Sequence, residues 1–273
     1  MVQEIVGQQE SSEQKPHEAD GSNLLSLASH ELRTPLSVIK WYTEMLLDGD
    51  CGELNADQTK YLRTIQTSNQ RAIDLIKSLL NVSRLDLGTF SINPTDVDLR
   101  FIVKQVFTEN RSILDEKRIH TEEMYVSGVP GMIPILQLDK QICLVIIRNL
   151  ISNAVIYSKE DSAIRVDIRE KKQGEEYGSK ILSDDSLVLA VFDSGIGIPQ
   201  EEQGKVFSKL FKASNVTNEE SKGAGLGLYI VETILSKIGG SIWFTSVKGQ
   251  GSTFCVAFPK HGMPKKEGRT MLE

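Results

Sequence analysis

Cysteine is scarce in this 273-residue sequence, which contains only Cys51, Cys143 and Cys255, far apart along the chain. An odd number of isolated cysteines excludes a disulfide framework and indicates free thiols in a reducing compartment. Their spacing does not fit a zinc site. An excess of basic charge is missing as well, because 31 Lys and Arg against 37 Asp and Glu give a net charge of −6. This balance gives no electrostatic reason to expect nucleic acid as a partner.

Long apolar runs are also missing. The run from Ile142 to Ile147 is far shorter than the roughly 18 to 20 apolar residues that cross a bilayer. The N-terminus is acidic and polar, unlike a signal peptide, so we expect residues 1–21 to be a linker or a truncated upstream segment. We therefore expect a cytoplasmic chain, with any membrane contact made only by segments upstream of it. Its length and globular composition fit two domains.

Residues 22–90 have the pattern of a helical hairpin. Two amphipathic stretches run from Asn23 to about Leu87, with the turn-forming segment 48–52 between them. Apolar residues recur at helical spacing on both stretches, at Leu25, Ala28, Leu32, Leu36 and Ile39, and at Leu62, Ile65, Ala72, Ile76 and Leu79. Two helices cannot bury both stripes alone. We therefore predict that two hairpins pair into a homodimeric four-helix bundle.

Residues 91–260 change to an α/β pattern. We predict strands at 164–168, 187–192, 241–247 and 253–258, and helices at about 99–116, 139–157 and 226–238. The polar insertion 171–185 is expected to form an extended hairpin loop. The tail 261–273 is expected to be disordered. The predicted fold class is therefore α+β, with the helical bundle followed by an α/β sandwich domain.

A histidine lies within the first helical stretch, in the segment Ser29–Leu36. His30 is followed by Glu31 and lies off the apolar stripe, so its side chain is expected to face solvent. Pro35 in a helix interior costs about 3 kcal/mol and normally kinks the helix. This combination fits a mobile reaction site. A functionally silent surface histidine beside a tolerated proline fits these residues as well.

The segment Arg148–Ala154 closes a predicted helix and carries Asn149 and Asn153 on one face, because residues four apart are neighbours. Two amide oxygens can help to hold a hard cation such as Mg²⁺, which takes its other ligands from water and phosphates. Two asparagines that make only local hydrogen bonds on a helix surface are the alternative.

Two glycine clusters follow. The first, Asp193-x-Gly195-x-Gly197, comes after a strand, and its Asp could accept a hydrogen bond from an adenine amino group. The second, at residues 223–227, leads into a helix, whose free backbone amides could bind phosphates. Taken alone, either cluster could be a simple turn.

The order of the motifs is more specific than any one of them. Along the chain come His30 with Glu31, Asn149 with Asn153, Asp193-x-Gly195-x-Gly197, Phe207 with Phe211, and Gly223-x-Gly225-x-Gly227. This order resembles the H, N, G1, F and G2 boxes of sensor histidine kinases, over about residues 22 to 260. The resemblance implies a HisKA-type dimerisation and phosphotransfer domain at 22–90 and a gyrase-like ATPase domain at 91–260.

The resemblance also implies roles for single residues. His30 would accept a phosphoryl group from ATP, with Glu31 deprotonating its imidazole, and Asn153 would bind Mg²⁺ with support from Asn149. Asp193 would read adenine. The other residues implied to contact the nucleotide are Tyr157, Gly195, Gly197, Phe207, Lys212, Gly223, Gly225, Leu226 and Gly227. The segment from Lys212 to Lys222 would be the ATP lid.

The partner implied by the resemblance is a response regulator, whose receiver domain would take the phosphoryl group on an aspartate. It would dock on an apolar stripe at Val38, Trp41, Tyr42 and Met45, although such a stripe can also be core. Thr34, one turn beyond His30, would hold a water for dephosphorylation of that aspartate. Back-bonding of Thr34 to the helix is the structural alternative.

Two positions depart from the family pattern, namely Ile156 where a Lys is frequent and Lys212 where an Arg is frequent. A Lys offers a point charge without the bidentate fork of Arg, so phosphate contact could be weaker. Two other functions compete with the kinase, a phosphatase-dominant enzyme and a nucleotide-sensing scaffold. A scaffold does not need a histidine beside a carboxylate, so His30 with Glu31 favours the kinase.

Overall fold

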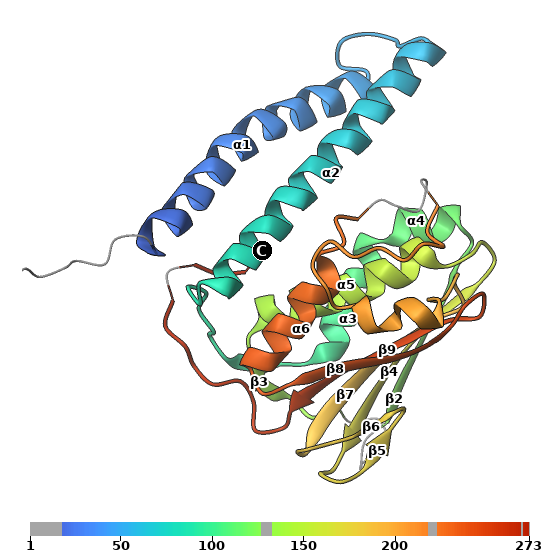
Figure 1. Cartoon of the computed structure of the whole chain (residues 1–273). Coiled ribbons are helices and arrows are strands. Elements are labelled where there is room, and N and C mark those ends of the chain that lie inside the picture. Colours follow the sequence, from blue (N-terminus) through green and yellow to red (C-terminus); the bar gives the residue numbers. More distant parts are fainter. Residues whose placement is uncertain (1–17, 127–132, 218–222, 269, 273) are drawn as a thin grey trace, which may run out of the picture.

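The computed structural model describes residues 18–126, 133–217, 223–268 and 270–272, with the backbone alone for residues 18–30. A helical hairpin lies above an α/β domain, and the helices of that domain lie between the hairpin and the sheet (Figure 1). The elements in chain order are α1 (Glu18–Leu47), α2 (Ala56–Asp86), β1 (Thr95–Val97), α3 (Leu99–Glu109), α4 (Arg111–Glu116), β2 (His120–Val126), β3 (Leu136–Leu138), α5 (Lys140–Tyr157), β4 (Ala163–Lys171), β5 (Glu176–Tyr177), β6 (Lys180–Ile181), β7 (Ser186–Asp193), the 3-10 helix η1 (Gln200–Lys205), α6 (Gly227–Lys237), β8 (Ser241–Val247) and β9 (Gly251–Pro259).

The hairpin forms as the sequence predicts. At the start of α2, the Asn55 side chain accepts a hydrogen bond from the Gln58 amide at 2.8 Å, and the Gln58 side chain accepts one from the Asn55 amide at 2.9 Å. This reciprocal capping box satisfies two amides that a helix start leaves open. Between the helices, the buried Asn69 side chain donates to the Leu36 carbonyl at 2.8 Å, which fixes the antiparallel register.

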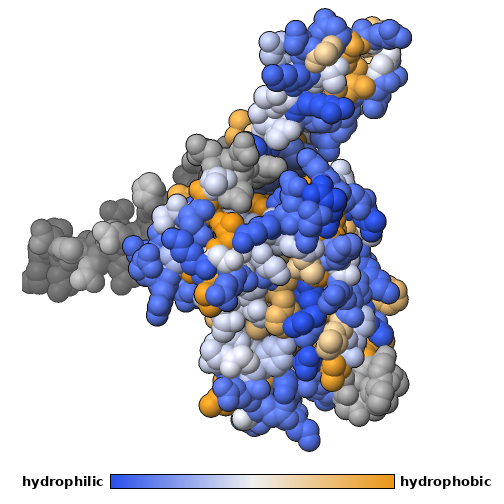
Figure 2. All heavy atoms as spheres, turned by 90° about the vertical axis from the view of Figure 1, so that its right-hand side faces the viewer, coloured by the Kyte–Doolittle hydropathy of each residue, from blue (hydrophilic) through white to orange (hydrophobic). Residues whose placement is uncertain are grey.

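Large apolar side chains stay at the surface of the hairpin. Leu32 and Ile39 on α1 and Ile65 and Leu79 on α2 are each at least 42% exposed. Figure 2 shows hydrophobic side chains among hydrophilic ones on this part of the molecule. The predicted stripes are therefore present and uncovered in a single chain, while the pairing of two hairpins stays a prediction.

The α/β domain is built on a five-stranded sheet of order β2-β4-β7-β9-β8, in which β2 and β4 are parallel and the other neighbours antiparallel. Helices α3, α5 and α6 cover one face (Figure 1). The central helix α5 buries Ile146, Ile147 and Ile151 completely against this layer. The predicted fold class, a helical hairpin followed by an α/β sandwich, is confirmed for the single chain.

Helix α5 (Lys140–Tyr157) is the one helix, among those that the structure describes, with the length and apolar character to cross a membrane. Most of its apolar side chains are buried in the core of the α/β domain. Core helices of globular domains meet the same criteria of length and composition, and the burial of α5 fits that explanation.

Several elements differ from the expectation. The predicted helix 99–116 is two helices, because the side chain of Asn110 bonds to the Val106 carbonyl and breaks the run. Strands β1, β2 and β3 were not anticipated. Strands β1 and β3 are only three residues long, and β2 is a mostly exposed edge strand without an apolar alternation. Residues 18–21 belong to α1, and residues 1–17 lie outside the described part. The insertion 171–185 contains the small hairpin β5–β6, in agreement with the predicted loop.

The C-terminal segment also differs from the expected disorder. Met263 and Leu272 are buried, and residues 266 and 270 form β-bridges with Ile92 and Phe90. The expectation of disorder was based on the basic residues of the tail. The two buried apolar residues hold the tail in an ordered position.

Candidate active site

Helix α5 presents the two asparagines. It begins at a cap in which the Asp139 carboxylate accepts hydrogen bonds from the amides of Gln141 and Ile142, at 2.9 and 3.1 Å. The Asn149 side chain donates to the Val145 carbonyl at 2.8 Å. Asn153, one turn further, is half-buried, and its side chain has no hydrogen-bond partner within the described chain. The bond of Asn149 is made by its nitrogen, so both side chains keep an amide oxygen as acceptor; that of Asn149 lies against Gly227.

The end of α5 is fixed by a lysine that sequence reasoning missed. The Lys117 ammonium donates to the carbonyls of Val155, Ile156 and Ser158, at 3.0, 2.7 and 3.0 Å. These are the carbonyls that a helix end leaves open, and a cation there also complements the helix dipole. Since Lys117 lies 38 residues before Val155, no local pattern could have revealed the contact.

Asp193 lies at the end of β7, beside the turn between β8 and β9. Its Oδ1 accepts hydrogen bonds from the amides of Gly195 at 2.9 Å and Ser252 at 3.2 Å. Burial raises the pKa of Asp193 to about 6, although both amide hydrogen bonds act to lower it. Both amides bind the same oxygen. The second oxygen, Oδ2, is therefore the one suited to a ligand.

The first glycine loop packs on the end of α5. A Cβ added to Gly195 would lie 2.3 Å from the Tyr157 carbonyl oxygen, closer than any real contact. The next amide, that of Ile196, donates to this carbonyl at 3.2 Å. The backbone of Tyr157, another predicted site residue, thereby anchors the loop, and only glycine allows this approach. Gly197 packs in the same way on the Val247 carbonyl.

The second glycine cluster meets the asparagine helix. A Cβ on Gly227 would lie 2.3 Å from Asn149 Oδ1, so a larger residue at the start of α6 would displace this side chain. Gly225 has φ +69° and packs on the backbone of Phe211, in the F motif. Helix α6 follows the buried Leu226 with no side chain capping its first amides. A helix start of this kind binds anions. Gly223, just before it, lies in the open.

The segment expected to be the lid is described up to Thr217, and residues 218–222 lie outside the description. Its Asn215 side chain donates to the carbonyls of Ile196 and Gly197, at 3.3 and 2.9 Å. The base of this segment is therefore attached to the first glycine loop. Asn215 was not predicted, because both of its partners are backbone carbonyls.

The F motif is partly core. Phe207 packs edge-on against Phe244 with ring centroids 5.7 Å apart, and Phe211 is half-buried. Lys212 is exposed. The predicted nucleotide-site residues on α5, the two glycine clusters and the F motif are thus brought to one side of the α/β domain.

The expected phosphoacceptor lies elsewhere. His30 is within α1, and its side chain is outside the described part of the structure. Glu31 and Thr34 are exposed on the same helix. The structure does not bring these three residues together with the glycine loops.

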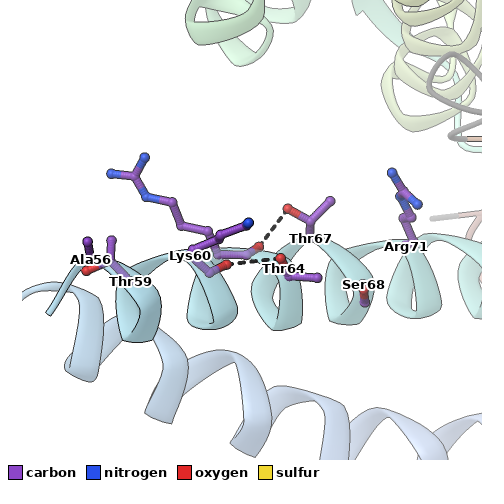
Figure 3. A pocket seen from close by; sticks show the side chains of 8 residues that line it. Ala56, Thr59, Lys60, Thr64, Thr67, Ser68 and Arg71 are labelled. Carbon is purple, nitrogen blue, oxygen red and sulfur yellow. Dashed lines mark hydrogen bonds between the residues drawn. The ribbon is translucent and has the colours of Figure 1, made fainter. Parts of the chain in front are cut away.

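Two open hollows lie on the hairpin. One, of about 390 Å³, is lined by Arg33, Thr34, Ser37, Val38 and Trp41. The other, of about 530 Å³, lies along α2, where Figure 3 shows Lys60, Thr67 and Arg71 pointing away from α1. Thr64 and Thr67 there donate to carbonyls of their own helix, so this hollow lies on the polar face of α2.

Comparison with known families places both parts of the chain. Residues 22–88 match the His Kinase A (phospho-acceptor) domain. Residues 139–262 match the family of histidine kinase-, DNA gyrase B-, and HSP90-like ATPases. The two matches follow the order of the hairpin and the α/β domain. The chain belongs to the two-component sensor histidine kinases. Its α/β domain is an ATP-binding domain, and the enzyme class is protein histidine kinase.

Relatives of known function agree with this assignment. The kinase core is 27% identical over 254 residues to the sensor histidine kinase WalK of Bacillus subtilis, covering 91% of this chain and 38% of the relative. It is 26% identical over 248 residues to a sensor protein kinase WalK of Staphylococcus aureus, covering 91% of this chain and 56% of the relative. The chain therefore spans less than two thirds of these relatives.

Solved structures share the fold. Full-length ShkA in complex with AMPPNP matches 90% of this kinase core and 47% of its own chain, with a TM-score of 0.67 at 22% identity. The Acinetobacter baumannii histidine kinase AdeS matches 85% of this core and 98% of its own chain, with a TM-score of 0.53 at 20% identity. At these identities the likeness concerns the fold alone.

Proposed function

We propose that the kinase core binds ATP with Mg²⁺, phosphorylates its own His30 and passes the phosphoryl group to an aspartate of a response regulator receiver domain. The observation that carries this proposal is the close contact of Gly227 with Asn149, which joins an anion-binding helix start to the asparagine helix. Phosphoryl transfer needs mainly alignment and charge neutralisation, and these groups supply both.

Asp193 would recognise the adenine. Its Oδ1 is occupied by two backbone amides, so Oδ2 would accept a hydrogen bond from the exocyclic amino group. An ionised carboxylate accepts but cannot donate, which selects a base with an amino group. The phosphates would lie toward the open amides at the start of α6, and Lys212 would contribute positive charge from the lid segment.

Asn153 would hold Mg²⁺, with Asn149 kept in place by its bond to Val145 and its contact with Gly227. The fit rests on the unpartnered amide of Asn153, because an amide oxygen suits a hard cation that keeps water and phosphate oxygens as its other ligands. When bound, Mg²⁺ would neutralise charge on the phosphates. The described residues contain no cluster of acidic, His or Cys ligands, which agrees with a metal held mainly by the nucleotide.

His30 would be the nucleophile. One imidazole nitrogen would attack the γ-phosphorus, ADP would leave, and the proton of the other ring nitrogen would pass to Glu31. The exposure of Glu31 on α1 supports access for an incoming nucleotide domain. This chemistry requires that the ATP-binding domain approach α1.

The test is incubation of the purified chain with γ-labelled ATP and Mg²⁺, in parallel with His30→Gln and Asn153→Ala. We expect a label that is stable to base and labile to acid in the parent chain and no label in either variant. His30→Gln should still bind ATP, because an acceptor side chain contributes nothing to the nucleotide site. A base-stable label that persists in His30→Gln would contradict the assignment.

We also propose that the kinase dephosphorylates its response regulator, with Thr34 holding the attacking water. Thr34 is exposed on α1, one turn from His30, and its hydroxyl can both donate and accept. Thr34→Ala should keep phosphorylation of His30 and lose dephosphorylation of the phosphorylated partner, while Thr34→Ser should keep both. Full phosphatase activity in Thr34→Ala would exclude the water-holding role.

The receiver domain would dock on α1 beside Thr34. Val38, Trp41 and Tyr42 are all exposed, and Val38 and Trp41 line the open hollow next to Thr34. The rings of Trp41 and Tyr42 are 5.1 Å apart, which makes a joined aromatic surface of the kind enriched at interfaces. If Trp41→Ala and Tyr42→Ala both transfer phosphate to the cognate receiver at the normal rate, the docking site is wrong.

The active unit would be a homodimer formed through the hairpins. The exposed stripe residues on α1 and α2 support this pairing, because four apolar side chains at least 42% exposed on one hairpin need a cover. We further propose that the core works in the cytoplasm, where ATP and response regulators are available, and that any membrane anchor lies in a segment beyond this chain.

A further inference from the structure

The C-terminal segment packs against the connection between the two domains. The linker is defined as residues 88–93, and the strap as residues 261–268 and 270–272. The matches to the two families cover 22–88 and 139–262, so nearly all of the linker and the strap lies outside both. Figure 1 shows the C-terminal end of the chain beside the end of α2. The contact between strap and linker therefore involves residues that lie almost wholly outside the two matched regions.

Backbone hydrogen bonds join the strap to the linker. The Ser91 amide donates to the Thr270 carbonyl at 2.9 Å, and the Ile92 amide donates to the Lys266 carbonyl at 2.9 Å. The Lys266 amide returns a bond to the Ile92 carbonyl at 3.1 Å. The strap thus pairs with the linker as a short strand pairs with its neighbour.

Side chains tighten this pairing. The Lys266 ammonium donates to the carbonyls of Gly88 and Phe90, at 2.6 and 3.0 Å, and lies 3.8 Å from the centre of the Phe90 ring. At Gly268 the two segments touch so closely that an added Cβ would lie 2.4 Å from the Phe90 carbonyl. Any side chain at position 268 would push the strap off the linker.

Both ends of the strap are anchored. At one end, the Met263 amide donates to the Gln137 carbonyl in the ATP-binding domain at 2.8 Å. At the other, Arg84 of α2 donates to the Met271 carbonyl at 2.6 Å, and Leu272 is buried in the hydrophobic cluster that includes Leu85 of α2. The strap therefore connects the ATP-binding domain to the last turn of α2.

The arrangement that the strap holds is not one that can transfer phosphate. The Tyr229 hydroxyl, in the first turn of α6, donates to Asp86 at 3.0 Å, which places the phosphate end of the site level with the end of α2. The bond between Asn69 and Leu36 sets the hairpin register. By that register His30 is level with residue 75, eleven residues or about 16 Å from Asp86 along α2. Transfer requires reacting atoms about 3 to 3.5 Å apart.

We propose that the strap is an autoinhibitory clamp, which fixes the linker and so keeps the ATP-binding domain docked at the base of α2, away from His30. Release of the strap frees the linker and lets the domain move along the hairpin. The proposal rests on the proposed phosphorylation of His30. The clamp acts on domain position, so it leaves ATP affinity unchanged.

The test compares the parent chain with Gly268→Ala, and with Gly204→Ala as the control, because a Cβ at Gly204 would meet no atom within 4 Å. Hydrogen exchange at the amides of Ser91 and Ile92 reports whether the strap is bound. Calorimetry gives the ATP affinity, and initial labelling of His30 at saturating ATP and Mg²⁺ gives the rate. Lys266→Met, with its exposed neighbour Lys265→Met as control, releases the strap by a second route.

In Gly268→Ala and Lys266→Met we expect faster exchange at Ser91 and Ile92, unchanged ATP affinity, and phosphorylation of His30 at least about fivefold faster than in the controls. Faster exchange with an equal or slower rate overturns the clamp and leaves the proposed kinase function standing. Slow exchange retained in both variants also overturns it. Absence of label from parent and variants alike overturns the proposed function, and the clamp with it.

Discussion

The ATP-binding domain and the helical hairpin use apolar residues in the same regular patterns, yet they bury them to different extents. In the domain, Ile146 and Ile147 of α5 are fully buried between α3, α6 and the sheet. In the hairpin, Leu32 is 50% exposed and Ile65 is 47% exposed. A sheet with helices on one face completes a core within one chain, whereas two helices present a face that needs another layer.

Because of this difference in burial, we expect nucleotide binding and the phosphorylation of His30 to depend differently on the dimer. The residues of the proposed nucleotide site are brought together inside one chain by contacts such as Gly195 on Tyr157 and Gly227 on Asn149. The hairpin that carries His30 leaves its apolar face exposed in one chain, and in the proposed homodimer a second molecule would cover it. The site should therefore tolerate loss of the dimer, and the hairpin should not.

The largest expected effect is on the hairpin. Ile65→Asp should convert the predicted dimer to a monomer, because an unpaired charge in a buried interface costs several kcal/mol. ATP affinity should stay unchanged, since the nucleotide site is complete in one chain. Sedimentation measures the mass, and Thr64→Asp, on the neighbouring exposed position, is the control. A parent chain that sediments as a monomer, or a dimer that survives Ile65→Asp, would contradict the pairing.

The next effect is on the core of the ATP-binding domain. Ile147→Ala should lower the free energy of unfolding by about 2 to 5 kcal/mol, because it leaves a cavity beneath the sheet. Ile135→Ala, at a side chain that is 61% exposed, should change it by less than about 0.5 kcal/mol. Urea denaturation followed by circular dichroism measures both. Equal losses in the two variants would remove the contrast between buried and exposed apolar residues.

Asp193→Asn should act in opposite directions on binding and stability. Loss of the charged acceptor should weaken ATP by about 1.5 to 3 kcal/mol, or roughly tenfold to a hundredfold. The asparagine oxygen can still accept both amides that now bind Oδ1. Nucleotide-free protein should become more stable at neutral pH, because the variant no longer buries a carboxylate.

The pH dependence of this variant follows from the raised pKa. Folding raises the pKa of Asp193 from 3.8 to about 6, so its stabilising contribution is present below 3.8 and is lost as pH rises through about 6. The parent chain should therefore lose stability relative to Asp193→Asn across this window. Thermal denaturation of both proteins from pH 4 to 8 measures the difference. Parallel curves would show that the buried carboxylate is not destabilising.

The smallest expected effect is at the contact between the two regions. Lys209 pairs with Asp86 at 2.7 Å, but the two side chains are 46% and 43% exposed. Lys209→Met should therefore cost only about 0.2 to 1 kcal/mol, with Lys205→Met as the exposed control. Partial burial acts to raise the pKa of Asp86. Hydrogen bonds from Lys209 and Tyr229 nevertheless hold this pKa below its ordinary value. The contribution of the contact to the free energy of unfolding should be present above pH 3.8 and should disappear in more acidic solution, where Asp86 is protonated. Denaturation at pH 7 that shows a loss of several kcal/mol would contradict a weak contact.

Much of this organisation could be predicted from the sequence, and the exceptions have physical reasons. The helices α1, α2, α5 and α6 have strong apolar periodicity, and Gly195, Gly197 and Gly225 each pack closely against backbone atoms. Lys117 and Asn215 were missed because their partners are carbonyls, which leave no mark on a sequence. The strap was missed because its contacts join segments some 175 residues apart, such as Lys266 and Phe90.

The most direct measurement is the site of the phosphoryl group. After incubation of the parent chain with ATP and Mg²⁺, tandem mass spectrometry at neutral to alkaline pH should locate the modified residue. We predict one phosphoryl group, on His30 of α1, that is lost on acidification. A phosphoryl group on a serine or threonine, or an unmodified His30 in a chain that binds ATP, would contradict the proposed histidine kinase activity.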